Sequence, residues 1–145
     1  IQAMAAYRDQ FRPSPRLAAP EGSIGVFVLC AETEEEARHH AASRDLWRLR
    51  LERGKLGPYP PPEEALAYDY SAEEMVRIEE NRRRQVVGDP AQCREGLEAH
   101  AEAYGVEEVV VVTIAHDFGA RVRSYELLAQ AFGMSAAAGQ RAAGE

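Results

Sequence analysis

The sequence predicts an α/β fold of about three strand–helix units, with parallel strands and outer helices. Three strand-sized apolar segments, at residues 24–31, 85–88 and 107–115, are each followed by a segment with helical periodicity. Such alternation is typical of a parallel sheet with right-handed crossovers. The 145 residues suffice for one domain with a substantial core. Three units are too few to close an eight-stranded barrel, which takes roughly 250 residues.

Composition excludes several classes of partner. The net charge of −7 argues against a nucleic-acid partner and against adhesion to an anionic membrane surface. No apolar run approaches the ~20 residues that cross a bilayer. The two cysteines, Cys30 and Cys93, are far apart in sequence, and we expect packing residues rather than metal ligands. Few cysteines also fit a reducing compartment, so we expect a cytoplasmic protein without a metal.

The first strand, IGVFVLCA at 24–31, is nearly continuously apolar, as in a strand covered on both faces. A short helix should precede it and end at Pro13. The second strand, QVVG at 85–88, is very short, and EEVVVVTIA at 107–115 is the strongest strand signal.

Helix starts follow a recurrent pattern in which a polar cap precedes a Glu or Gln. Thr33 with Glu36, Ser71 with Glu74, and Asp89 with Gln92 have this spacing. Gly96 inside the third of these helices suggests close packing. A last helix should begin near Phe118. The expected apolar faces are Ala42, Leu46 and Leu49; Cys93, Leu97, Ala101 and Tyr104; and Val122, Tyr125, Leu128 and Phe132.

Residues 54–70 form a proline-rich insert within a domain spanning 1–133. Three consecutive prolines exclude a helix or a central strand there. The insert could form a lid over a pocket, or it could be a packed surface loop. Residues 134–145 are small and polar, and we expect a disordered tail.

Ligands of parallel α/β folds bind at the carboxyl ends of the strands. His116 and Asp117 follow the third strand, and His116 could act as an acid, a base or a hydrogen-bond donor. Asp117 is either its partner or the cap of the next helix. Gly88 and Asp89 lie at the carboxyl end of the second strand, where free amides could receive an anion. The Asp89 carboxylate opposes a phosphate at that place.

No motif in the chain identifies a reaction. Walker, GxGxxG, GxSxG, HExxH and CxxC patterns are absent from the sequence. The triplet Arg82–Arg84 could bind phosphate, but cations at a helix C-terminus need no ligand to explain them.

Several segments resemble the luciferase-like flavin-dependent monooxygenases. They are YRDQFRPS (7–14), VFVLCAETEEEAR (26–38), VVGDPAQCREGLEAHAEAYGVEEVVVVT (86–113) and RSYELLAQAFG (123–133). The resemblance implies a (β/α)8 TIM barrel of which this chain is the C-terminal portion, with its strands as the sixth, seventh and eighth. It also implies reduced FMN, or a deazaflavin in some branches, which activates O2 to oxidise a small organic substrate.

The catalytic histidine and most flavin-phosphate contacts of that family lie in the first five strands, so no catalytic residue is carried over to this chain. We expect it to be inactive alone, with His116, Asp117, Gly88 and Asp89 as candidates at the mouth of the barrel. Asp89 stands where the family often has Ser or Thr, which puts a polar ligand contact there in doubt.

A different class of function fits the same pattern. Buried-type strands leave unpaired sheet edges, and such edges are templates for pairing. The alternative is therefore a non-enzymatic association module that forms a homo-oligomer through exposed sheet edges.

Overall fold

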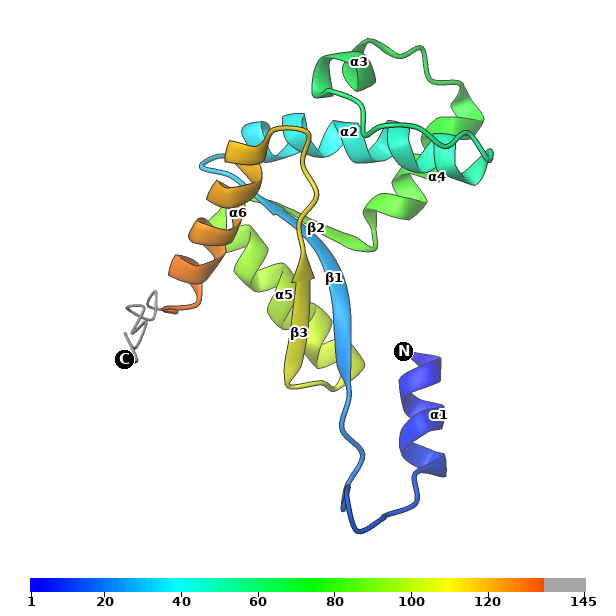
Figure 1. Ribbon diagram of the computed structural model, residues 1–145, viewed down its shortest axis with the longest axis vertical. Coiled ribbons are helices and arrows are strands. Elements are labelled where there is room, and N and C mark those ends of the chain that lie inside the picture. Colours follow the sequence, from blue (N-terminus) through cyan, green and yellow to red (C-terminus); the bar gives the residue numbers. More distant parts are fainter. Residues whose placement is uncertain (135–145) are drawn as a thin grey trace, which may run out of the picture.

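The computed structural model describes residues 1–134, which form a three-stranded parallel sheet with helices on both faces (Figure 1). The expected tail at 134–145 therefore lies, apart from Met134, outside the described residues. The elements in chain order are α1 (Gln2–Gln10), β1 (Ser23–Cys30), α2 (Glu34–Glu52), α3 (Pro62–Ala67), α4 (Ala72–Arg82), β2 (Gln85–Gly88), α5 (Pro90–Tyr104), β3 (Glu108–Val112) and α6 (Phe118–Ala131).

The strand order is β2-β1-β3, with β1 in the centre. The first half of β1 pairs with β3, from Ser23 opposite Glu108 to Phe27 opposite Val112. Its second half pairs with β2, ending with Cys30 opposite Gly88. Three parallel strands with outer helices are confirmed. The order β2-β1-β3 differs from the chain order in which three consecutive barrel strands would pair, and the barrel itself stays a prediction.

The order follows from the paths of the connections. Ala37 of α2 packs against Phe27 and Leu29 on one face of β1. Cys93 and Leu97 of α5 pack against the opposite face. The chain thus leaves β1 across one face and returns across the other, and this brings β3 to the free side of β1.

We call the face covered by α5 and α6 the helix face. Its buried core comprises Val26, Val28, Cys30, Val86, Cys93, Leu97, Leu127 and Leu128. Gly96 belongs here as expected, since a Cβ on it would come within 2.9 Å of a Val86 methyl group. Both cysteines are buried and free, also as expected.

We call the opposite side, which carries Phe27 and Leu29 of β1, the open face. Strand partners in register point to the same side, so Val110 and Val112 of β3 also belong to it. Phe27 and Leu29 are buried, but Val110 and Val112 are 49% and 44% exposed. The open face is therefore covered over β1 and uncovered over β3.

The predicted helix caps are present. Ser71 with Glu74 and Asp89 with Gln92 form complete capping boxes. The Thr33 side chain accepts a hydrogen bond from the Glu36 amide at 3.2 Å, which is one half of the expected box. None of the helices within residues 1–134 is long and apolar enough to cross a membrane.

The insert at 54–70 contains a short helix that the prolines were expected to exclude. The last of the three prolines, Pro62, is the first residue of α3. A proline is tolerated there because the first helical residue needs no amide donor. Ala65 and Tyr70 pack against Leu46 of α2, so this part of the insert is anchored on that helix.

The third strand is shorter than expected, because the chain leaves the ladder at Thr113. Its hydroxyl donates to the Val28 carbonyl at 2.8 Å, and its amide donates to the Tyr125 hydroxyl at 3.1 Å. The apolar face of α6 is also displaced from the expected stripe. Ser124, Leu127 and Leu128 are buried, whereas Tyr125 remains partly exposed.

Candidate functional site

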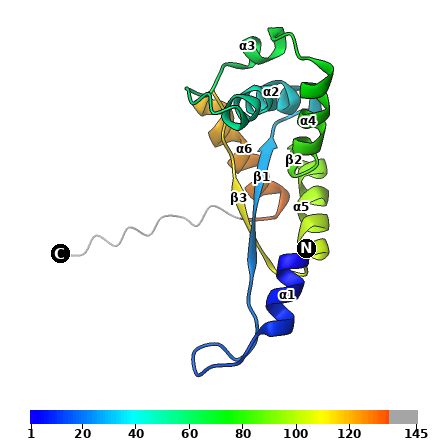
Figure 2. The same cartoon turned by 90° about the vertical axis from the view of Figure 1, so that its right-hand side faces the viewer.

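The carboxyl ends of the strands meet at one edge of the sheet, next to α2, α3 and α4 (Figures 1 and 2). In both views α1 lies at the opposite end of the molecule. The predicted site residues all follow strands that end at this edge. The insert and α2 therefore lie on the side of the sheet where parallel α/β folds bind ligands.

Gly88 and Asp89 are occupied by structural contacts. Both the Ala91 and Gln92 amides donate to Oδ1 of Asp89 at 2.9 Å. The Gly88 carbonyl accepts from the Ala31 amide at 3.2 Å. A Cβ at Gly88 would stand 2.4 Å from Oε1 of Gln92, so glycine makes room for the cap of α5. The carboxylate of Asp89 thus already fills this helix N-terminus.

Asp117 is the cap of α6, since its Oδ1 accepts a hydrogen bond from the Ala120 amide at 2.7 Å. His116 next to it is exposed. Within residues 1–134 no hydrogen bond joins the His116 ring to Asp117. The imidazole therefore remains available to a ligand, and its contact with a cofactor stays a prediction.

The two predicted clusters do not form one site. Gly88 ends β2 and Asp89 follows it, whereas His116 and Asp117 follow β3, and β1 lies between these strands. Two strand spacings separate such positions by roughly 10 Å. A small group bound beside one cluster would not reach the other directly.

Tyr59 of the insert reaches the segment after β3. Its hydroxyl donates to the Ile114 carbonyl at 3.3 Å. Its ring lies against that of Trp47 on α2, with 5.9 Å between the ring centroids. Burial raises the pKa of the Tyr59 hydroxyl, so this group stays protonated and can keep donating. The insert therefore spans the edge from α2 to the chain that leads to His116.

Arg44 of α2 is a residue of the open face that sequence reasoning did not single out. Its guanidinium carbon lies 3.9 Å from the centroid of the Phe27 ring, on the open face. Burial lowers the pKa of Arg44, and the nearby Tyr59 opposes that shift. A signal was available in the sequence: Arg44 has no acidic residue three or four positions away on its helix.

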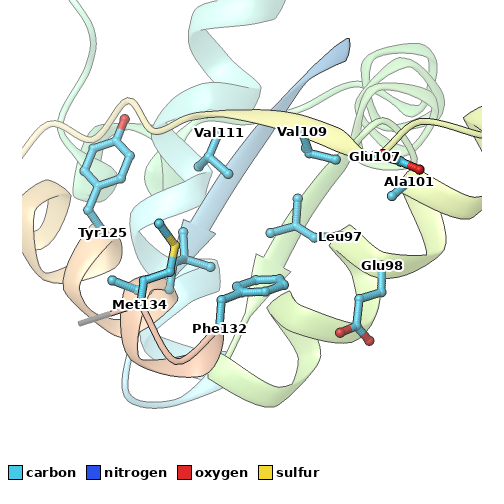
Figure 3. Close-up of a pocket in the computed structure, with 11 residues that line it drawn as sticks. Leu97, Glu98, Ala101, Glu107, Val109, Val111, Tyr125, Phe132 and Met134 are labelled. Carbon is cyan, nitrogen blue, oxygen red and sulfur yellow. The ribbon is translucent and has the colours of Figure 1, made fainter. Parts of the chain in front are cut away.

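An apolar hollow lies elsewhere, on the helix face (Figure 3). It has a volume of about 780 Å³ and lies between α5, β3 and α6. Figure 3 shows Val109 and Val111 entering it from the strand, opposite Leu97 and Phe132. Most of its lining is apolar, although Glu98 and Glu107 also contribute, and it lies against β3, the strand with an unpaired edge. We call it the edge groove.

Metal chemistry has no support among the residues that the structure describes. They contain no group of three or more His, Cys, Asp or Glu side chains that could hold a metal ion. The thiol of Cys93 donates to the Gly88 carbonyl at 3.4 Å, which fits its expected role in packing.

The chain is similar in sequence to parts of longer proteins. The uncharacterized protein YceB of Bacillus subtilis is 41% identical over 130 residues, which make up 90% of this chain and 39% of YceB. A luciferase-like monooxygenase of Escherichia coli K12 is 29% identical over 127 residues, or 88% of this chain and 38% of that protein. No protein-family model matches the chain.

A solved structure shares the fold. The crystal structure of apo-MsnO8 matches with a TM-score of 0.80 and 35% identity, over 92% of this chain and 41% of that one. The chain thus spans about two fifths of the length of the proteins it matches. This partial coverage fits the expectation that the chain corresponds to one portion of a longer luciferase-like protein.

Proposed function

We propose that the chain is the C-terminal portion of a luciferase-like, flavin-dependent monooxygenase with a TIM-barrel fold. The whole enzyme would use reduced FMN and O2 to oxidise a small organic substrate in the cytoplasm. The observation that carries the proposal is similarity over nearly the whole chain, to a luciferase-like monooxygenase in sequence and to MsnO8 in structure. The position of the insert and His116 at the strand ends agrees with it.

The described residues suit the aromatic ring of a flavin better than its phosphate. The helices that begin at the strand ends have their first amides occupied by Thr33, Asp89 and Asp117. A cofactor phosphate would need such amides free. The open face instead offers apolar side chains and the ring of Tyr59, which suit a flat aromatic ring. This chain would therefore hold the ring of the cofactor, while other parts of the enzyme hold its phosphate.

Within such an enzyme the flavin supplies the redox chemistry. The residues of this chain would orient the ring and exclude water from it. His116 can donate or accept a hydrogen bond at the edge of the bound group, because its ring is exposed and free of protein partners within the described residues. Tyr59 can hold the insert closed through its bond to Ile114.

A titration of FMN with the purified chain tests this function, with quenching of flavin fluorescence as the signal. We expect saturable binding in the micromolar range. Replacing His116 with Ala should weaken it without changing the thermal midpoint, and His39→Ala on α2, beside Glu63, is the matched control. Circular dichroism shows whether the chain is folded. If the folded chain did not bind FMN, the proposed contribution to the cofactor site would be contradicted.

A second function is favoured by the free edge of β3. The exposed Val110 and Val112 lie beside it on the open face, and the apolar edge groove follows it on the helix face. An association module would bury these surfaces in a homo-oligomer. Sedimentation equilibrium distinguishes the two: a concentration-dependent dimer supports association, and a monomer that binds FMN excludes it as the main function.

A further inference from the structure

We propose that Arg44 forms the anion-binding end of a substrate subsite, which takes the carboxylate of a small organic acid with an apolar body. This inference rests on the proposed function, because a bound acid would be a substrate only in an enzyme. The binding itself does not depend on flavin.

Arg44 differs from the other arginines of α2 in lacking a partner. Arg38 pairs with Glu34, Arg48 with Glu52 and Arg50 with Glu64. Within residues 1–134, Arg44 makes no hydrogen bond or ion pair with a protein group. The other three pair on the outer surface, whereas Arg44 faces the sheet.

The nearest carboxylate on the same helix is already engaged. Asp45 accepts two hydrogen bonds from Arg82, at 2.8 Å from Nη2 and 3.1 Å from Nε. Asp45 is almost fully buried in that pair and acts on Arg44 only as a nearby charge, without a hydrogen bond or an ion pair between them. The acid that shares the open face on β3 is Glu108, which lies opposite Ser23, four residues along β1 from Phe27. Within the described residues, Arg44 is thus left without a hydrogen-bonded or ion-paired protein partner.

The guanidinium is nevertheless held in place. It lies over the face of Phe27, a contact that restrains the plane of the cation without using its N–H donors. Phe27 is itself buried by α2, so its ring cannot move away. An oriented guanidinium with unused donors matches the two oxygens of a carboxylate.

A carboxylate fits this place better than a phosphate. Phosphate sites usually combine several donors, including free amides at a helix N-terminus. The helix N-termini at this edge are capped by their own side chains. Arg44 stands near the middle of α2, away from any helix end. One planar cation without backbone donors suits a single carboxylate.

The surroundings of Arg44 indicate the rest of the ligand. Val112 is the strand partner of Phe27, so its exposed side chain lies beside the ring under Arg44. Ile114, two residues further on, is 38% exposed. Tyr59 contacts the Ile114 carbonyl, and Trp47 lies against Tyr59. An aryl or alkyl body attached to the carboxylate would be desolvated against these side chains.

A titration of the chain with sodium benzoate tests the subsite directly. Trp47 is the single tryptophan, so its indole N–H gives one signal in a ¹H–¹⁵N spectrum. We expect a saturable shift of that signal with benzoate in the millimolar range, and no saturable shift with neutral benzamide or with inorganic phosphate at equal ionic strength. An equal response to benzamide or phosphate, or no response to benzoate, would overturn the proposal.

Two matched variants test whether Arg44 supplies the positive charge that binds benzoate. The variant Arg44→Gln should weaken benzoate binding about tenfold or more, because it removes a charge-assisted pair. Arg48→Gln, one turn away and paired with Glu52, should leave it unchanged. Equal loss in both variants would point to a general effect of charge and contradict the assignment. Benzoate binding needs no FMN, so the two proposals can fail separately. A chain that binds benzoate but not FMN would support the subsite and contradict the proposed cofactor contact, and the reverse result would contradict the subsite alone.

Discussion

The two sides of the sheet are held together by different forces. On the helix face, α5 and α6 bury a continuous apolar core against β1 and β2. On the other side, α2 and α3 share a smaller apolar cluster around Leu46, and ion pairs also join α2, α3 and α4, including Arg50 with Glu64, Arg53 with Glu74 and Arg82 with Asp45. In each of these pairs the arginine remains accessible to solvent, and such pairs contribute less to stability than buried apolar contacts do.

This difference separates the part that folds the chain from the part that can bind. The helix face has few unused polar groups and is closed except along the edge groove. The open face carries Arg44 without a partner and apolar side chains that remain exposed on β3. Low stability and unpaired groups are typical of regions that close over ligands. We therefore expect the helix face to serve as scaffold and the open face to contact the ligand.

The largest expected effect is on the helix face. Replacing Leu97, which is 4% exposed, with Ala should lower the free energy of unfolding by about 3 kcal/mol through lost burial and a cavity. Urea denaturation followed by circular dichroism measures it. Val112→Ala on the open face is the control, and we expect roughly 0.5 kcal/mol or less there. Equal losses would mean that both faces are core.

A smaller effect is expected at the cap of α5. The variant Asp89→Ala removes the acceptor of two amide hydrogen bonds and should cost about 1 kcal/mol. Asp89→Asn, which keeps an acceptor oxygen, should restore most of it. The same denaturation measurement applies. If Asp89→Ala left stability unchanged, the carboxylate would be free for a ligand rather than used by the helix.

The smallest effect, in the α2–α4 region, should depend on pH. The Ser71 amide lowers the pKa of Glu74 below its usual value of 4.5, and Arg53 adds to this shift. Because the folded-state pKa is the lower one, the carboxylate stabilises the fold above pH 4.5, and this contribution is lost as the pH falls through the folded value.

The variant Glu74→Gln should therefore have a lower thermal midpoint than the parent chain at pH 7, and the gap should close in acid. Glu73→Gln, one residue earlier on exposed surface, is the control at both pH values. A gap that stays constant from neutral to acidic pH would show that charge at Glu74 is not involved.

Much of the fold follows from local sequence signals. The segment 24–31 predicts a strand covered on both faces, and the spacing of Asp89 and Gln92 predicts a helix start, because each depends on neighbouring residues alone. Strand order does not follow from such signals, since it depends on which face each connection crosses. Pro62 also shows the limit of a local rule, because a proline run can open a helix that it cannot continue.

The candidate site was predicted in part. Parallel topology places His116 at the carboxyl edge from sequence alone. The sequence could not show that Asp89 and Asp117 are used as caps by their helices. It also could not show that Arg44 lies over Phe27, which is 17 residues earlier in the chain. That contact requires the three-dimensional path of α2.

Mapping FMN on the ¹⁵N-labelled chain tests the assignment of ligand contact to the open face most directly. We expect the largest amide shifts at Val112, Ile114 and His116, with the signals of Leu97 and Leu128 on the helix face unmoved. Shifts concentrated on Leu97, Leu128 and Phe132 would place the ligand in the edge groove and contradict the division between scaffold and binding face.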